Sequence, residues 1–402
     1  MRLLVYICLM SFSYATVAQT TVVEKVKSYV DSKEYAKAKQ IITQQLEKTE
    51  DNGLLVALWY YKGRLWTEEY FETANIFEES DAAYQEKSYR LLEGIAAFQN
   101  AVKRNDGDYS ETALRQIGGL HRYLKDMAFS YLHKKNTERF YLNLHWARSC
   151  DRFVQQYVPE SANYEMDTML LYLVAHGAEL TDRSFEVKSC YEALLLEGVT
   201  EEELFVDNYS MLMALGEMER AKNIVEQGLL KYSGSIALIK NKLHWLMTNE
   251  YYEETITFVN EKTAILPESE TGRFYFVKGL AWDARYQEAL RLQIPDAGFY
   301  FQETEKAYQK AVSISPTTFD FAFNLAALYY NKVVLIQPDS IPATNHANDY
   351  ALFMQRATET LETTLDLNAA DRKVIDALED LYRRTNQTEK LEQLRNPKGT
   401  GN

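Results

Sequence analysis

Apolar side chains recur every three or four residues between positions 202 and 232, which is the spacing of one buried helix face. The first run, within residues 202–216, consists of Leu204, Phe205, Tyr209, Leu212 and Leu215. The second, within residues 218–232, consists of Ala221, Ile224, Val225 and Leu229. Gly216 stands between them and can take the positive φ that ends a helix. The pattern therefore predicts a helical hairpin.

The same pattern returns 34 residues later. The first series is Phe205, Tyr209, Leu212, Ala221, Val225, Gly228 and Ser233, and its counterparts are Ile239, Leu243, Leu246, Thr255, Val259, Lys262 and Pro267. A fixed period of this length indicates a unit that buries its apolar face only by stacking on copies of itself. The chain has only 7 prolines and 16 glycines in 402 residues and no linker rich in them, which also favours a continuous helical solenoid.

Other segments carry small and aromatic residues in a pattern that resembles the tetratricopeptide-repeat (TPR) family. That family has a small residue and then an aromatic in the first helix, and alanines around an aromatic in the second. The matching residues are Gly63, Trp66, Phe98 and Ala101, then Gly279, Trp282, Tyr308, Ala311 and Pro316. Looser or weaker matches are Ala326, Tyr329, Ala357 and Leu361; Tyr29, Ala38 and Ile42; Gly119, Ala147 and Pro159; and Ala178 and Ala193.

The resemblance implies an all-α, right-handed α–α superhelix of about nine helical hairpins; the alternative is an irregular helical bundle. Long interruptions of the period at residues 64–93, 280–303 and 327–356 are expected to lengthen the flanking helices, so that compact and protruding hairpins alternate. Within the last, residues 337–348 should form an exposed loop. We expect degenerate repeats over residues 19–200, regular repeats over 201–318, and further repeats with a polar cap over 319–402.

Residues 1–18 have the pattern of a cleaved secretion signal. Arg2 precedes a short apolar run over residues 3–12, and small residues up to Ala18 offer a cleavage site. The alternatives, a core helix or a membrane anchor, are weaker, because an anchor needs about 20 apolar residues. The mature protein is therefore expected to be exported, either periplasmic or secreted.

The net charge is −14. An acidic chain is a poor partner for nucleic acid or for anionic lipid surfaces, and no other segment is apolar enough to span a bilayer. The expected partner is a protein or peptide, including one within a complex of the cell envelope. Cys150 and Cys190 remain after the leader. They are predicted on second helices of adjacent repeats as buried thiols, with a disulfide as the alternative.

Catalytic and metal-binding motifs are missing from the sequence. The six histidines have no ligand spacing, and no CxxC, HExxH, nucleophile elbow or phosphate loop occurs. His121, His133 and His145 follow one another at 12-residue intervals, but the repeat pattern breaks the intervening helix near residues 134–137. We therefore expect no cofactor, no metal and no enzymatic activity.

If the TPR geometry applies, first helices line a concave groove, and residues just off the packing positions point into it. In the most regular repeats these are Lys240, His244, Arg273, Phe276, Asp283, Phe323, Tyr330 and Asn331. The aromatic residues could anchor a ligand, and Lys240 and Arg273 could bind a carboxylate; alternatively, all are ordinary solvated or packing positions. Lys240 matches one position of the carboxylate clamp of some family members, but the other clamp residues do not follow.

Two functions fit this pattern. The favoured one is a non-catalytic exported scaffold that binds a protein or peptide through its groove or its protruding hairpins. The alternative is a solute-binding protein of the cell envelope, with glycans as one class of ligand, because exposed aromatics suit sugars as well as peptides.

Overall fold

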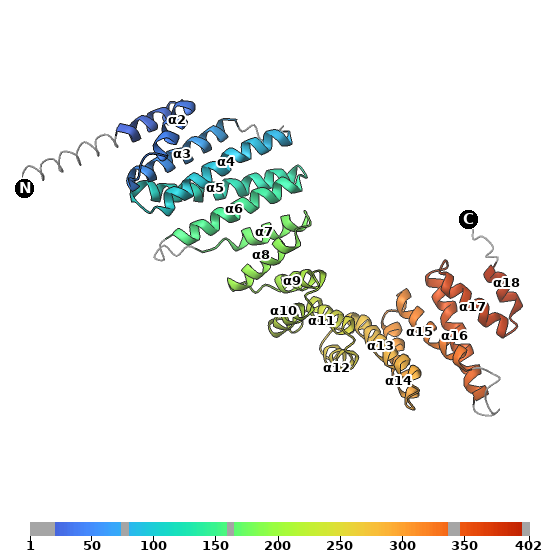
Figure 1. Cartoon of the computed structure of the whole chain (residues 1–402). Helices are drawn as coiled ribbons and strands as arrows, with labels where there is room; N and C mark the ends of the chain where they lie inside the picture. Colours follow the sequence, from blue (N-terminus) through green and yellow to red (C-terminus); the bar gives the residue numbers. More distant parts are fainter. Residues whose placement is uncertain (1–20, 74–79, 159–164, 337–345, 396–402) are drawn as a thin grey trace, which may run out of the picture. The chain divides into compact units, whose positions relative to one another are not determined.

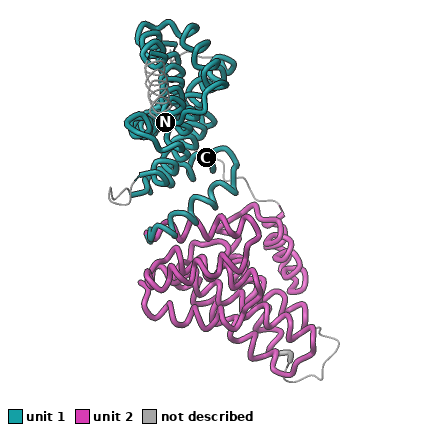
Figure 2. The backbone as a smooth tube through the Cα atoms, turned by 60° about the vertical axis from the view of Figure 1, so that its left-hand side comes forward, with its two compact units in different colours: residues 1–200 teal, residues 201–402 magenta. Residues whose placement is uncertain are grey.

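The computed structural model describes residues 21–73, 80–158, 165–336 and 346–395 (Figure 1). These residues form helices and turns, with no strand among them, and within each compact unit the labelled helices that follow one another in the chain contact each other. The signal sequence predicted over residues 1–18 lies outside the described residues. Contacts divide the chain into two compact units, residues 1–200 and 201–402, called unit 1 and unit 2 (Figure 2).

Unit 1 consists of four helical hairpins. Residues 21–31 are helical, and a short turn separates them from the first labelled helix, with which they form the first hairpin. The helices that follow are α2 (Tyr35–Leu46), α3 (Asn52–Thr73), α4 (Asp81–Lys103), α5 (Gly107–His133), α6 (Thr137–Tyr157), α7 (Thr168–Glu179) and α8 (Ser184–Leu196). The break near residues 134–137 is confirmed, so His121 and His133 lie on α5 and His145 on α6.

Unit 2 continues the same architecture through five further hairpins. Its helices are α9 (Glu202–Ala214), α10 (Met218–Lys231), α11 (Ile236–Thr248), α12 (Tyr252–Thr263), α13 (Glu268–Arg291), α14 (Ala297–Ile314), α15 (Phe319–Leu335), α16 (His346–Leu367), α17 (Arg372–Arg384) and α18 (Thr388–Arg395). The predicted all-α array of about nine hairpins is confirmed over the described residues.

The 34-residue period extends to a third hairpin, which the side-chain pattern did not reveal. Gly216 has a φ of 74°, as predicted, and Glu250 in the next hairpin has a φ of 62°. Asp182, 34 residues before Gly216, has a φ of 57°. Each of these residues lies two positions before a second helix, where a left-handed residue reverses the chain. A left-handed residue thus recurs every 34 positions in these turns, although only one of the three residues is a glycine.

The hairpins differ in length because of their helices, as predicted for residues 64–93, 280–303 and 327–356. Helices α3 and α4 have 22 and 23 residues, α13 and α14 have 24 and 18, and α15 and α16 have 17 and 22. The expected alternation of compact and protruding hairpins is wrong. Helices α5 and α6 are also long, with 27 and 21 residues, so two long hairpins are adjacent in each unit.

The segment predicted as an exposed loop over residues 337–348 lies mostly outside the described residues. Its last three residues belong to α16, which begins at His346, so the loop was predicted three residues too long. At the end of unit 2, α18 has no buried residue.

Two glycines in the long hairpins face aromatic rings, as the TPR resemblance implies. A Cβ added at Gly63 would lie 2.5 Å from the ring of Phe98, and one at Gly279 would lie 2.3 Å from the ring of Tyr308. These glycines therefore let the two helices of a hairpin approach closely. Gly119 was expected to play the same part, and this is wrong, because a Cβ there would meet no atom within 4 Å.

Candidate functional site

The eight groove residues predicted from the sequence all lie on first helices of unit 2. Helix α11 carries Lys240 and His244, α13 carries Arg273, Phe276 and Asp283, and α15 carries Phe323, Tyr330 and Asn331. Lys240, His244, Arg273 and Asn331 are exposed, and the other four are half-buried. These helices form because their apolar residues recur at helical spacing and bury one side in the hairpins. Whether the eight residues contact a ligand stays a prediction.

The two basic residues among them carry charges that the protein does not neutralise locally. Neither Lys240 nor Arg273 forms an ion pair with another described residue, although both are exposed. Many other lysines and arginines of this acidic chain have carboxylate partners on their own or a neighbouring helix, as Arg285 does with Glu253 and Glu288. An anionic ligand would find these two cations available.

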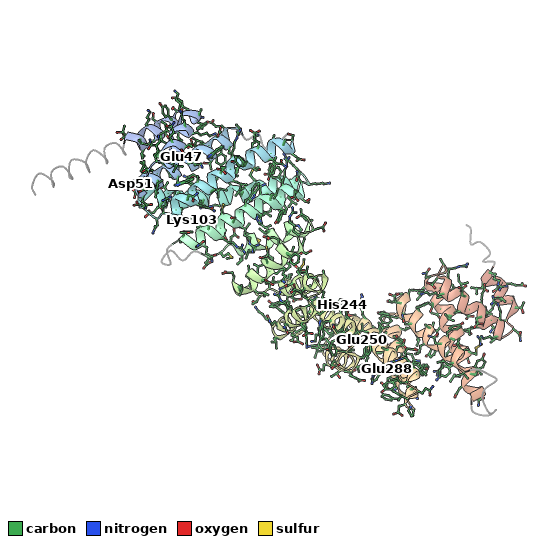
Figure 3. All side chains as sticks on the ribbon, in the orientation of Figure 1. Glu47, Asp51, Lys103, His244, Glu250 and Glu288 are labelled. Carbon is green, nitrogen blue, oxygen red and sulfur yellow. The ribbon has the colours of Figure 1, made fainter. Side chains whose placement is uncertain are left out.

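His244 is labelled in Figure 3, and Lys240 precedes it by four residues, one helical turn along the same side of α11. Its Nδ1 lies 2.8 Å from the hydroxyl of Tyr209 on α9. A tyrosine hydroxyl and an imidazole nitrogen can each donate or accept, so this hydrogen bond links α9 and α11 with either tautomer of His244. The exposed imidazole thus adds a polar ring to the face of α11 that carries Lys240.

The aromatic residues predicted as ligand anchors already make contacts within unit 2. Phe276 of α13 stacks on Phe321 of α15 with ring centroids 4.8 Å apart, and Phe323 stacks on Phe319 of the same helix at 5.6 Å. The Tyr330 hydroxyl donates to Oδ2 of Asp380 at 3.1 Å. Truncating these rings would therefore disturb the fold as well as any groove.

The half-buried Asp283 is a poor candidate for a cation ligand. Burial raises the pKa of its carboxyl above the usual range, and the Gln287 side chain donates to Oδ1 at 3.1 Å. A carboxyl whose ionised form is disfavoured contributes less negative charge to its surroundings.

A cluster in unit 1 combines residue types that occur in active sites, a histidine, a carboxylate and a thiol, around the buried Arg148. The Arg148 guanidinium donates to Oε1 of Glu186 at 2.8 Å and lies 2.9 Å from Sγ of Cys190, while His145 lies 3.5 Å from the same carboxylate. Burial raises the pKa of both Cys150 and Cys190 to about 12, which is the opposite of what a nucleophilic thiolate needs. The two cysteines are buried thiols on α6 and α8, as predicted.

The structure also contains a cavity that the sequence did not indicate. It has a volume of about 610 Å³ and is bounded by α10, α11 and α12. Trp245 and Leu246 of α11 lie at its base, and Phe258 of α12 forms one wall. The only signal in the sequence was the helical spacing of Glu254, Phe258 and Glu261, which also fits a solvated helix face.

The ends of the long hairpins expose apolar side chains. Phe71 and Tyr89 in the α3–α4 hairpin are 46% and 57% exposed, and Leu292 and Phe299 in the α13–α14 hairpin are 54% and 53% exposed. Isolated exposed apolar residues are common on protein surfaces. The two pairs of exposed residues leave the protruding hairpins as the second candidate surface for a partner, beside the groove.

Within the described parts of the chain, no group of three or more His, Cys, Asp and Glu side chains is placed to hold a metal ion. The side chain of His346 lies outside the described ones. Over the same parts, none of the helices combines the length and apolar character needed to cross a bilayer.

No protein-family model matches the sequence, and no curated protein matches it. Solved structures do resemble the chain. MamA from Desulfovibrio magneticus RS-1 is 15% identical, with a TM-score of 0.37, over 50% of this chain and 97% of that one. The C-terminal part of a TPR repeat-containing protein from Cytophaga hutchinsonii is 12% identical, with a TM-score of 0.43, over 66% and 99%. A TPR repeats protein from Bacteroides fragilis is 13% identical, with a TM-score of 0.34, over 54% and 99%.

With TM-scores below 0.5, these similarities carry no argument about this chain. The stronger observations are in the chain itself, namely consecutive helical hairpins, a 34-residue period in both side chains and turn geometry, and glycines closed against aromatic rings. The chain thus has the fold of the tetratricopeptide-repeat proteins.

Proposed function

We propose that this protein is a non-catalytic exported scaffold that binds an acidic segment of a partner protein along α11 and α13 of unit 2. The observation that carries the proposal is a pair of exposed cations, Lys240 and Arg273, that form no ion pair with another described residue and lie on the first helices of consecutive hairpins. The exposed His244 adds a polar imidazole to the same face of α11. A charge-assisted contact is about twice as strong as a neutral hydrogen bond, so carboxylates are the best complement for this surface.

The glycan-binding alternative has less support from this geometry. A sugar platform needs a free aromatic face, but Phe276 and Phe323 each already stack on another ring. The proposal that the protein is exported rests on the pattern of residues 1–18. If this proposal is correct, the protein expressed with its own leader is recovered outside the cytoplasm with Gln19 at its N-terminus.

Binding is tested with residues 19–402 and a fluorescein-labelled heptapeptide of four glutamates around a central leucine, followed by fluorescence anisotropy. The double variant Lys240→Glu/Arg273→Glu should weaken binding about thirtyfold, because two attractive contacts worth about 0.5 kcal/mol each become repulsive by a similar amount, a total change of about 2 kcal/mol. The matched control Lys25→Glu/Lys373→Glu makes the same charge change at two exposed lysines outside the groove and should have little effect.

Equal weakening in both double variants would show that only the overall charge matters, and it would refute the groove proposal. Binding that is lost instead on Leu292→Ser/Phe299→Ser would place the partner at the protruding hairpin. Binding of neutral oligosaccharides in place of the acidic peptide would support the glycan alternative.

A further inference from the structure

We propose that unit 2 carries a second docking site, the cavity between α10 and α12, and that it takes an extended basic peptide segment with a large apolar side chain. The site lies on the opposite side of α11 from the proposed groove. At 100° per residue, Lys242 lies about 200° around the helix from Lys240, and Leu246 about 240°. Lys240 and His244 therefore face one way, while the residues at the base of the cavity face the other.

The base of the cavity is an indole held in place from several directions. The side chain of Trp245 is 2% exposed, and its Nε1 donates to the carbonyl oxygen of Met218 at 2.9 Å. Its ring stacks on Tyr251 with centroids 5.3 Å apart and planes 12° apart. The ammonium groups of Lys222 and Lys242 lie 5.0 and 5.2 Å from the ring. These contacts cover the indole, so it fixes the shape of the cavity from below, and a cavity shaped in advance costs little conformational entropy when a side chain binds.

Accessible apolar surface completes the cavity. Tyr251 is 43% exposed, and Phe258 on α12 is half-buried at the wall. A volume of about 610 Å³ is large enough for one aromatic or long aliphatic side chain together with the backbone beside it. The cavity therefore fits a peptide anchor residue better than a single ion.

The charge of the residues that line the cavity indicates which residues should flank the apolar side chain of the peptide. Four glutamates and two lysines line the cavity, which gives a net charge of −2. Lys242 is already paired with Glu226 of α10, and Lys222 lies over the indole. The charged residues that α12 contributes to the rim of the cavity are all glutamates. Two of them, Glu254 and Glu261, are exposed and form no ion pair with another described residue. A ligand that matches the negative charge of this rim therefore carries positive charge.

The spacing of these acids sets the spacing of the cations. Glu254 and Glu261 are seven residues apart on α12, about 10 Å along the helix axis, with Thr257 and Phe258 between them. An extended peptide covers that distance in about three residues. The segment that fits best has two lysines or arginines three residues apart, with an aromatic or long aliphatic residue between them that enters the cavity.

The probe is a fluorescein-labelled peptide of sequence Gly-Lys-Phe-Gly-Lys-Gly, with comparison peptides in which both lysines are glutamates or the phenylalanine is glycine. On residues 19–402 we expect each comparison peptide to bind at least fivefold more weakly than the probe. Binding of the probe should also weaken as salt rises, since the contacts lie at an exposed rim.

Three variants locate the site. Glu254→Lys/Glu261→Lys should weaken probe binding about tenfold, whereas the matched reversal Glu389→Lys/Glu392→Lys, at two exposed glutamates of α18, should change it less than twofold. Thr257→Trp, at an exposed position, should block the cavity without touching the core, and its helical melting curve should match that of the unmodified protein.

This inference does not depend on the groove, so the two can fail separately. Lys240→Glu/Arg273→Glu should leave binding of the basic peptide within twofold, just as Glu254→Lys/Glu261→Lys should not weaken binding of the acidic peptide. Equal binding of all three peptides, equal effects of the two glutamate reversals, or undiminished binding to Thr257→Trp would each overturn the second site.

Discussion

Replacing Gly279 with alanine adds one methyl group at the closest approach of α13 and α14. The new Cβ would lie 2.3 and 2.4 Å from two ring carbons of Tyr308, about 1 Å short of ordinary contact. Tyr308 is 0% exposed and packs beside Phe276, with ring centroids 5.8 Å apart, so its ring has little room to move. The two helices must therefore separate, or the ring must leave its preferred rotamer.

The expected cost follows from two opposing terms. Overpacking of a filled core costs about 1–3 kcal/mol, and alanine gains up to about 1 kcal/mol over glycine as a helix former. We expect Gly279→Ala to lower the free energy of unfolding of unit 2 by about 1–2 kcal/mol. Gly298→Ala, in the same hairpin, meets no atom within 4 Å, so only the helix gain remains, and it should be neutral or stabilising by up to about 1 kcal/mol.

The assay is urea unfolding followed by far-UV circular dichroism, with hydrogen exchange to localise the effect to α13 and α14, because repeat arrays need not unfold in one step. Tyr308→Leu, which removes the ring, should suppress most of the penalty of the alanine in a double-mutant cycle. The reasoning is refuted if both alanine variants shift stability in the same direction, or if the penalty is unchanged with leucine at position 308.

Two further predictions concern a buried histidine and the hairpin turns. Burial lowers the pKa of His121 below 6.5, so the folded state binds fewer protons than the unfolded state, and unit 1 should lose stability as pH falls below about 6.5. In thermal melts between pH 7.5 and 5, His121→Gln should flatten this loss; a steeper loss would contradict the assignment. In the turns, Gly216→Ala should cost about 1 kcal/mol because its φ is 74°, whereas Glu250→Gly, at a φ of 62°, should gain about 0.5 kcal/mol in urea unfolding. Shifts of the same sign at both positions would show that the two turns are not equivalent.

Which parts of this protein could be predicted from its sequence depends on how local their causes are. Helices α9 to α12 follow from apolar spacing within single segments, and the turn at Gly216 follows from one glycine. The close contacts of Gly63 with Phe98 and of Gly279 with Tyr308 also have a sequence signature, since a small residue and a ring recur in the same order. The groove residues could likewise be assigned to first helices before the structure was known.

The errors arose where the outcome depends on a neighbouring element. Gly119 has the sequence signature of a packing glycine, but no helix approaches it, so its side stays open. Phe276 could be placed on its helix from the sequence, but only the structure shows that Phe321 of the next hairpin stacks on its ring; whether Phe276 also contacts a ligand stays a prediction. A residue's own position on a helix does not say what is packed against it.

By itself, the sequence determined the helical hairpin and its period, because both rest on the spacing of residues within one segment and on what glycine allows at a turn. Only the tertiary structure decided that the turn geometry repeats at Asp182 and Glu250 without a glycine, and that α10, α11 and α12 enclose a cavity over Trp245. A cavity is the space left between side chains from separate helices, and its shape is fixed only when those helices pack.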